Sequence, residues 1–209
     1  MISISGKIWT EQKVNKNLVE KFKQDYGFTE ILSKLIISRN YDLSEIYGID
    51  NKQKIINIFK DDKDFQKASL ILIKAINNNE NICILGDYDV DGTCATSLLV
   101  RYFKHINQKH FFYIPDRIKD GYGASKKLFQ KLILRNPNLI IMVDCGSTSN
   151  EAIDYLNKHQ IKSIIIDHHE INKPYPKSNA IINPKKGSIK KENTLLCATA
   201  LTYFFIETI

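Results

Sequence analysis

Apolar residues recur with a helical period over the first 80 residues of the chain. They occupy every third or fourth position in Val14–Tyr26, Thr29–Ile37 and Asp64–Asn77, which is the spacing of an amphipathic helix. Gly27 lies between the first two segments and favours a break there. We therefore expect residues 1–80 to form a helical N-terminal section.

From Asn81 onward, short apolar runs alternate with amphipathic segments. Each run is typical of a strand that is buried on both faces. The expected strands are Ile82–Leu85, Phe111–Ile114, Leu139–Val143, Ser163–Ile166 and Ala180–Ile182. The expected helices are Thr93–His105, Ser125–Leu134 with Ser125 as N-cap, Asn150–His159 and Leu195–Ile209. Alternating strands and helices predict an α/β fold over residues 81–209, with a parallel sheet of about five strands flanked by helices.

Charged side chains follow the ends of four expected strands. Asp87, Asp89 and Asp91 follow the first strand, and Arg117, Asp144 and the triplet Asp167–His168–His169 follow the next three. The carboxyl ends of parallel strands meet at one edge of a sheet, so these groups should lie together there. Aspartates at alternating positions in an extended stretch point the same way and repel one another unless a cation neutralises them.

Carboxylates together with imidazoles are suitable ligands for Mn²⁺ or Mg²⁺. Two such ions could stabilise the attacking and leaving oxygens of a phosphodiester, with water as the nucleophile. A calcium-binding EF-hand is excluded, because the twelfth position from Asp87 holds Leu98 and not glutamate. Cys145 lies beside Asp144, so the carboxylates should raise its pKa and make it a poor nucleophile. The usual glycine-rich nucleotide-binding loops are also missing after the strands.

Net charge and composition narrow the class of protein further. The formal charge is +7, and an acidic cluster surrounded by basic residues suits an enzyme that acts on a polyanion. No apolar stretch reaches the ~18–20 residues that span a membrane, and the N-terminus has no secretory signal pattern. We therefore expect a cytoplasmic protein that does not associate with membranes. Its four widely spaced cysteines should be free thiols.

Taken together, these motifs resemble the DHH phosphoesterase family, which is named after the triplet at residues 167–169. The matching segments are Gly86–Gly92, Ile114–Arg117, Asp120–Gly123, Val143–Gly146, Asp167–Glu170 and Ile181–Pro184, and the helical section with Trp9 also resembles the start of such proteins. The resemblance is strongest to family members that degrade single-stranded DNA from 5′ to 3′ in repair and recombination. It implies such an exonuclease activity here, with Mn²⁺ or Mg²⁺, two ions in the complete enzyme, and other repair or recombination proteins as further partners.

The same resemblance implies roles for individual residues. The implied metal-site residues are Asp87, Asp89, Asp91, Asp144 and His168. The implied catalytic residues are Asp167, as a supporting residue, and His169, as a phosphate-binding or acid–base residue. The implied substrate-binding residues are Arg117, Gly121, Tyr122 and Gly123. Some family members have a histidine before the first motif, where this chain has Leu85.

The resemblance also implies that part of the enzyme is not contained in these 209 residues. The family has a fourth motif with a further metal-binding aspartate, and then C-terminal DHHA1 and OB-type domains. The expected catalytic domain at residues 81–209 stops before all of these. We therefore expect the chain by itself to be weakly active or inactive.

Two alternative functions remain open at this point. Asp89–Thr93 matches the D-x-D-G-T motif of haloacid-dehalogenase-like phosphatases, in which Asp89 would be the nucleophile. That alternative leaves the triplet at residues 167–169 unexplained. The second alternative is a degenerate DHH domain that binds nucleic acid or serves as an interaction module.

Overall fold

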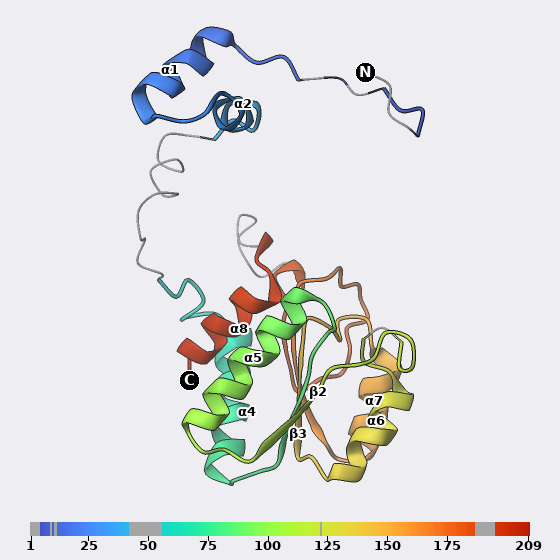
Figure 1. Ribbon diagram of the computed structural model, residues 1–209. Coiled ribbons are helices and arrows are strands. Elements are labelled where there is room, and N and C mark those ends of the chain that lie inside the picture. Colours follow the sequence, from blue (N-terminus) through green and yellow to red (C-terminus); the bar gives the residue numbers. More distant parts are fainter. Residues whose placement is uncertain (1–4, 9, 11, 42–55, 122, 187–194) are drawn as a thin grey trace. The chain divides into compact units, whose positions relative to one another are not determined.

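The computed structural model describes residues 5–8, 10, 12–41, 56–121, 123–186 and 195–209. The chain divides into two compact units, Met1–Ile56 and Asn57–Ile209 (Figure 1). Trp9, which contributed to the family resemblance, lies outside the described residues. Within the described parts, no helix has the length and apolar character needed to cross a lipid bilayer.

The first unit contains a pair of helices, α1 (Lys16–Tyr26) and α2 (Glu30–Ser38). Gly27 ends α1 in the left-handed conformation, with φ of 67°, which a glycine adopts without strain. The hydroxyl of Thr29 then caps α2 by accepting a hydrogen bond from the backbone N–H of Leu32. Phe22 and Ile36 form the small apolar core between the two helices.

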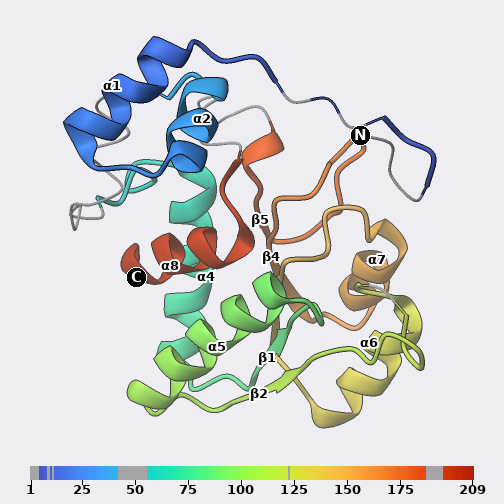
Figure 2. The same ribbon diagram turned by 45° about the horizontal axis from the view of Figure 1, so that its top comes forward.

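The second unit is built on a five-stranded parallel sheet in the order β2-β1-β3-β4-β5 (Figure 2). The strands are β1 (Ile82–Leu85), β2 (His110–Tyr113), β3 (Leu139–Val143), β4 (Lys162–Ile166) and β5 (Ala180–Ile182). The predicted α/β fold is confirmed. The order of the strands reverses between β1 and β3, which is where open sheets of this type bind ligands.

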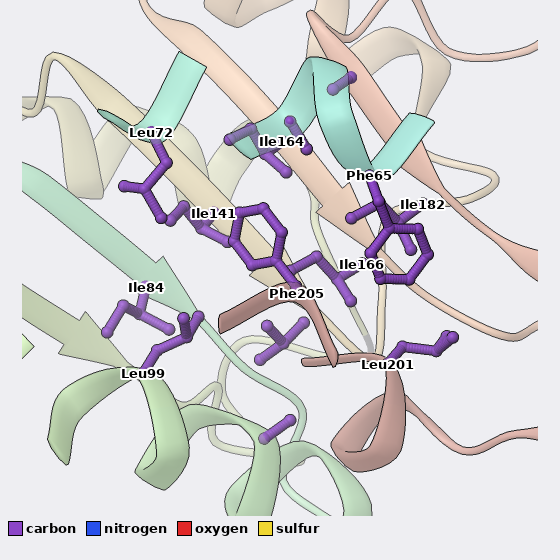
Figure 3. Packing of buried hydrophobic residues seen from close by; sticks show 14 of the residues in the cluster. Phe65, Leu72, Ile84, Leu99, Ile141, Ile164, Ile166, Ile182, Leu201 and Phe205 are labelled. Atoms are coloured by element: carbon purple, nitrogen blue, oxygen red, sulfur yellow. The ribbon is translucent and has the colours of Figure 1, made fainter. Parts of the chain in front are cut away.

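Helices cover both faces of the sheet (Figure 1). One face carries α4 (Lys63–Asn77), α5 (Val90–His105) and α8 (Ala198–Glu207), and the other carries α6 (Lys126–Leu132) and α7 (Asn150–Lys158). Short 3₁₀ helices follow at η1 (Ile133–Arg135) and η2 (Pro184–Lys186). Residues of one strand alternate between the two cores, because successive side chains point to opposite faces. Figure 3 shows Phe65, Leu99 and Phe205 from three helices packed over Ile141 and Ile166.

Three element boundaries are informative when compared with those expected. Helix α4 packs against β5 and belongs to the second unit, although its sequence was grouped with the helical N-terminal section. Helix α5 begins three residues earlier than expected, at Val90, because Asp89 provides its N-cap. Helix α6 begins after Ser125, whose hydroxyl accepts a hydrogen bond from the N–H of Leu128, as predicted.

Candidate active site

The carboxyl ends of β1, β3 and β4 bring acidic and imidazole side chains together. Two groups of potential metal ligands lie there, each with its ligand atoms within 4.8 Å of one another. One group is Asp87, Asp89 and Asp144, and the other is Asp144, His168 and His169. Asp144 belongs to both groups, so a single carboxylate links the two halves of the site.

Two glycines allow the loop after β1 to approach the start of α5 closely. A Cβ atom on Gly92 would lie 2.6 Å from the backbone nitrogen of Asp87, and one on Gly86 would lie 2.0 Å from the hydroxyl oxygen of Thr96. A larger residue at position 92 would therefore displace Asp87 from its buried position, and one at position 86 would displace the side chain of Thr96. Burial raises the pKa of Asp87, while a hydrogen bond from the N–H of Tyr88 opposes this shift.

The three aspartates after β1 do not point the same way, contrary to the sequence-based expectation. Helix α5 begins at Val90, so only Asp87 and Asp89 precede it, and Asp91 lies in its first turn. The carboxylate of Asp89 accepts a hydrogen bond from the N–H of Gly92 at 2.9 Å and caps the helix. The extended stretch that we predicted therefore ends at Asp89.

Asp91 instead caps helix α8. Its carboxylate accepts hydrogen bonds from the N–H groups of Ala198 at 2.7 Å and Thr199 at 2.8 Å, and from the Thr199 hydroxyl at 2.6 Å. Burial raises the pKa of Asp91, but these hydrogen bonds outweigh it, so the pKa lies below its ordinary value. Asp91 Oδ2 is 3.5 Å from His168 Nε2. Asp91 therefore lies beside the two ligand groups without belonging to either, and its role as a ligand stays a prediction.

Asp144 has the least favourable surroundings of the acidic residues in the site. Its backbone has φ of 61°, in the left-handed region, and its N–H donates to the carbonyl of Ile166, which extends the pairing of β3 with β4. The residue is 1% exposed, and neither carboxylate oxygen has a hydrogen-bond partner among the described residues. Burial first, then the charge of Asp91, and then the close approach of the Asp89 carboxyl and its charge raise the pKa of Asp144 to about 8.

A buried carboxylate without partners is unfavourable unless a positive charge compensates it. His168 offers one such contact, since its Nε2 lies 3.2 Å from Asp144 Oδ1. The surrounding side chains supply the oxygen and imidazole ligands that divalent cations prefer. The residues present therefore fit a divalent cation at Asp144, with Asp87 and Asp89 on one side and the two histidines on the other.

Asp167 organises the loop after β4. Its Oδ1 accepts hydrogen bonds from the N–H of His168 at 2.8 Å and from His169 Nδ1 at 2.8 Å, and its Oδ2 accepts one from the N–H of Ser147 at 3.0 Å. Burial raises the pKa of Asp167, but the hydrogen bonds from Ser147 and His169 outweigh it and lower the pKa overall. Asp167 is thus an ionised hydrogen-bond partner of the His169 ring, and the supporting role in catalysis that the resemblance implied stays a prediction.

The loop after β2 places Arg117 beside Tyr88. The Arg117 guanidinium carbon lies 5.4 Å from the centre of the Tyr88 ring, and Tyr88 lies between Asp87 and Asp89 in the chain. Asp120 fastens this loop by accepting hydrogen bonds from the Tyr113 hydroxyl and from Lys131, each at 2.6 Å. Arg117 is exposed, and its phosphate-binding role stays a prediction.

The glycines that follow also have positive φ, 81° for Gly121 and 69° for Gly123. Gly123 is buried, and a Cβ atom on it would lie 3.9 Å from Cys145 Cβ, so this loop reaches the end of β3. Tyr122 lies outside the described residues. A cleft of about 510 Å³ lies between this loop and His169, lined also by Ser147 and Asp167.

The predicted inertness of Cys145 is supported by its surroundings. Burial, and then the charges of Asp167, Asp87 and Asp144, raise the pKa of its thiol well above the ordinary value. All four cysteines carry free thiols, as expected.

The profile of the family described as "DHH family, N-terminal domain" matches residues 81–208. The chain belongs to the DHH family. The matched region contains the whole parallel sheet and every residue of the two ligand groups.

Relatives within the DHH family include the single-stranded-DNA-specific exonuclease RecJ of Bacillus subtilis, which is 29% identical over 180 residues. RecJ of Escherichia coli is 29% identical over 142 residues. These alignments cover 85% and 68% of this chain, but only 23% and 25% of the two relatives. The chain therefore spans about a quarter of the length of the curated relatives that it matches.

Solved structures of RecJ proteins share the DHH fold. Exonuclease RecJ bound to manganese matches with a TM-score of 0.64 and 26% identity, over 70% of this chain and 37% of the other. RecJ of Thermus thermophilus in complex with Mn²⁺ matches with a TM-score of 0.66 and 18% identity, over 93% of this chain and 27% of the other. The latter comparison shows similarity of fold alone.

Sequence reasoning missed three polar residues that support the DHH site. Thr199 holds Asp91, while Ser147 and Asn183 hold the loops after β3 and β4. Ser147 belongs to a serine- and threonine-rich stretch without a distinctive spacing. Asn183 belonged to a matching family segment, but only the structure shows what its side chain contacts.

Proposed function

We propose that this chain carries the metal-binding part of an exonuclease that hydrolyses phosphodiester bonds in single-stranded DNA. The proposed cofactors are Mn²⁺ or Mg²⁺, with two ions in the complete enzyme. Membership in the DHH family and similarity to single-stranded-DNA-specific exonucleases support this proposal. The metal is supported by RecJ structures that contain manganese or Mg²⁺.

The observation that carries the proposal is the position and environment of the Asp144 carboxylate. It is buried, has no hydrogen-bond partner among the described residues, and belongs to both groups of potential ligands. One carboxylate that belongs to two ligand sets could help to hold two adjacent cations. We therefore assign Asp87, Asp89 and Asp144 to one ion, and Asp144 and His168 to the other, with Asp91 as a further candidate.

When bound, the cations would neutralise the aspartates, polarise the phosphate and favour ionisation of an attacking water. The side chains of this protein would contact the phosphate and take part in proton transfer. His169, held by Asp167 through Nδ1, would direct its other nitrogen to the phosphate or to a proton in transfer. Arg117, together with Gly121, Tyr122 and Gly123, would contact the DNA backbone, since a guanidinium pairs with two phosphate oxygens at once.

The direction of digestion and the cellular role belong to the same proposal. We propose 5′→3′ digestion in DNA repair and recombination, in the cytoplasm and together with other proteins of those pathways. These features rest on the family resemblance and on the names of the relatives, which state specificity for single-stranded DNA. The D-x-D-G-T match of residues 89–93 is accounted for by the first DHH motif, so membership in the DHH family replaces the haloacid-dehalogenase alternative.

Efficient hydrolysis is expected only when the chain is joined to the further domains that its relatives carry. We expect a chimera in which the chain replaces the matching region of Bacillus subtilis RecJ to digest labelled single-stranded DNA with Mn²⁺. The 209-residue chain alone should be at least ~100-fold slower, because it corresponds to only 23% of Bacillus subtilis RecJ and would act without the DNA-positioning contacts that we expect from the rest of that enzyme. A nuclease assay on single-stranded and blunt double-stranded substrates measures both.

Circular dichroism and a melting curve of each protein provide the control for folding. Full activity of the short chain would contradict the proposal that a second part of the cleft is required. A folded chimera that binds single-stranded DNA and Mn²⁺ but cuts neither substrate would instead support the degenerate-domain alternative.

Replacing Arg117 by alanine should weaken the binding of single-stranded DNA roughly tenfold, because the variant loses a charge-assisted pair with phosphate. Affinity for Mn²⁺ should stay unchanged, and the slope of binding against salt concentration should fall by about one phosphate contact. Fluorescence anisotropy with a labelled oligonucleotide over a range of salt concentrations measures both quantities. Lys119→Ala, an exposed cation in the same loop, is the matched control. If Arg117→Ala binds single-stranded DNA as tightly as the parent protein does, and if that binding does not depend on salt concentration, DNA does not lie along this edge of the sheet.

A further inference from the structure

Asp120 joins the two elements that flank the loop after β2. Its side chain is 4% exposed. Its Oδ2 accepts hydrogen bonds from the Tyr113 hydroxyl at 2.6 Å and from the N–H of Asp116 at 3.1 Å, and its Oδ1 accepts one from Lys131 Nζ at 2.6 Å. Tyr113 is the last residue of β2, Asp116 begins the loop, and Lys131 belongs to α6. One buried carboxylate therefore connects the strand, the loop and the helix.

The backbone of residues 116–120 is closed on itself by hydrogen bonds. The N–H of Asp120 donates to the carbonyl of Asp116 at 2.9 Å, while the N–H of Asp116 donates to the Asp120 carboxylate. Asp116 Oδ1 also accepts hydrogen bonds from the N–H groups of Ile118 and Lys119, both at 2.9 Å. Arg117 lies between these bonded residues, so the backbone on both sides of it is held in place.

The side chain of Arg117 depends on this backbone for its direction. It is exposed, and its guanidinium carbon lies 5.4 Å from the centre of the Tyr88 ring in the loop after β1. An arginine side chain has many rotamers, and holding it in one of them costs up to about 2 kcal/mol of conformational entropy. A single exposed contact with an aromatic ring contributes only about 0.5–1 kcal/mol. The contact with Tyr88 can persist only where the loop already places Arg117 beside that ring.

We propose that Asp120 is a positioning residue that holds the Arg117 guanidinium over the Tyr88 ring by closing the loop between β2 and α6. The carboxylate is suited to this role because it stays ionised. Hydrogen bonds from Lys131 and then Tyr113 lower the pKa of Asp120 to about 2. Hydrogen bonds to an ionised acceptor are roughly twice as strong as those between neutral groups. The contact of Arg117 with DNA rests on the proposed function, but its place over Tyr88 does not.

The first test is Asp120→Ala, which removes the acceptor that the three donors share. In the metal-free 209-residue chain, the nuclear Overhauser contacts between Arg117 and the Tyr88 ring should disappear. Exchange of the Ile118 and Lys119 N–H groups should accelerate about tenfold, the effect of one hydrogen bond. NMR measures both quantities without DNA. Asp154→Ala removes an exposed aspartate on α7, so it changes the net charge equally and should alter neither quantity.

The second test is DNA binding by the chimera with RecJ, measured by fluorescence anisotropy. Asp120→Ala should weaken the binding of single-stranded DNA roughly tenfold, as Arg117→Ala does, and the double variant should bind no more weakly than either. The direction is informative, because removal of an anion by itself strengthens the attraction of a polyanion. General damage to the structure would add to the effect of Arg117→Ala, whereas loss of positioning would not.

Contacts between Arg117 and Tyr88 that persist in the folded Asp120→Ala variant would overturn the proposal, and so would additive losses of DNA affinity in the double variant. If Asp120→Ala does not fold, Tyr113→Phe decides the question, because it removes one donor and no charge. Exchange of the Ile118 and Lys119 N–H groups should then accelerate roughly threefold, and unchanged exchange would overturn the proposal. If the chimera binds no DNA, the proposed function fails, while the NMR result still decides whether Asp120 positions Arg117.

Discussion

Replacing Asp144 by asparagine is expected to abolish Mn²⁺ binding and DNA hydrolysis while making the metal-free chain more stable. The carboxylate is shared by both ligand groups, so its loss should lower hydrolysis by the chimera with RecJ roughly 10³-fold or more. Its carboxyl is also buried beside Asp89 and Asp91, and its pKa of about 8 means that the folded chain disfavours the charged form. Replacing it by a neutral amide should raise the free energy of unfolding at about pH 8 on the order of 2 kcal/mol.

Isothermal titration with Mn²⁺ and thermal melting of the 209-residue chain measure the two effects separately. Asp154→Asn, an exposed aspartate on α7, is the matched control and should change neither. Asp89→Asn should also abolish hydrolysis, but without a comparable gain in stability, because Asp89 caps α5. Normal turnover in Asp144→Asn would mean that the site is placed wrongly.

The stability of the metal-free chain should fall as the pH rises from about 5 to about 8. In the folded chain the pKa of Asp144 is raised to about 8 from an ordinary value of 3.8. The unfolded chain therefore binds fewer protons at this residue between those values, so its contribution to stability is fully present below about pH 4 and is lost as the pH passes through 8. Asp91 and Asp167 have lowered pKa values, so their contributions are lost only at acid pH.

Mn²⁺ should reverse this loss at about pH 8, since binding to the folded state alone adds about 2.7 kcal/mol at a concentration 100 times the dissociation constant. Melting curves with and without Mn²⁺ across this pH range measure the effect. Asp144→Asn should make the metal-free profile less steep, leaving the smaller contribution of Asp87, whose pKa is also raised, and should eliminate the response to Mn²⁺. A metal-free profile that rises toward pH 8 in the unaltered chain would contradict the assignment of a raised pKa to Asp144.

The alternation of apolar runs and amphipathic segments was enough to predict the parallel sheet. The strands Ile82–Leu85, Leu139–Val143 and Ala180–Ile182 were predicted to the residue, because continuous apolar runs are needed where both faces of a strand are buried. The ends of the apolar runs then located the ends of the strands. They predicted one edge where Asp87, Asp144 and the histidines meet, and the structure places these groups together.

Side-chain direction at that edge could not be predicted from spacing. Asp91 alternates with Asp87 and Asp89 in the sequence, yet it caps α8, whose first residues lie more than 100 positions away. The early start of α5 depends on the hydrogen bond from Gly92 to Asp89, which competes with an extended backbone. Such competition is decided by local geometry and by the packing of α5 against α8.

Periodicity and motifs of fixed spacing were enough to predict the fold class, the residue types at the site and the resemblance to the DHH family. The folded chain was needed to show that Asp144 is shared between two ligand groups, that Asp91 holds α8, and that Asn183 reaches Ser147 and His169. Each of these facts is a contact between segments that are distant in the chain. Burial and hydrogen bonding across such contacts, not the identity of one residue, set the charge and orientation of each side chain.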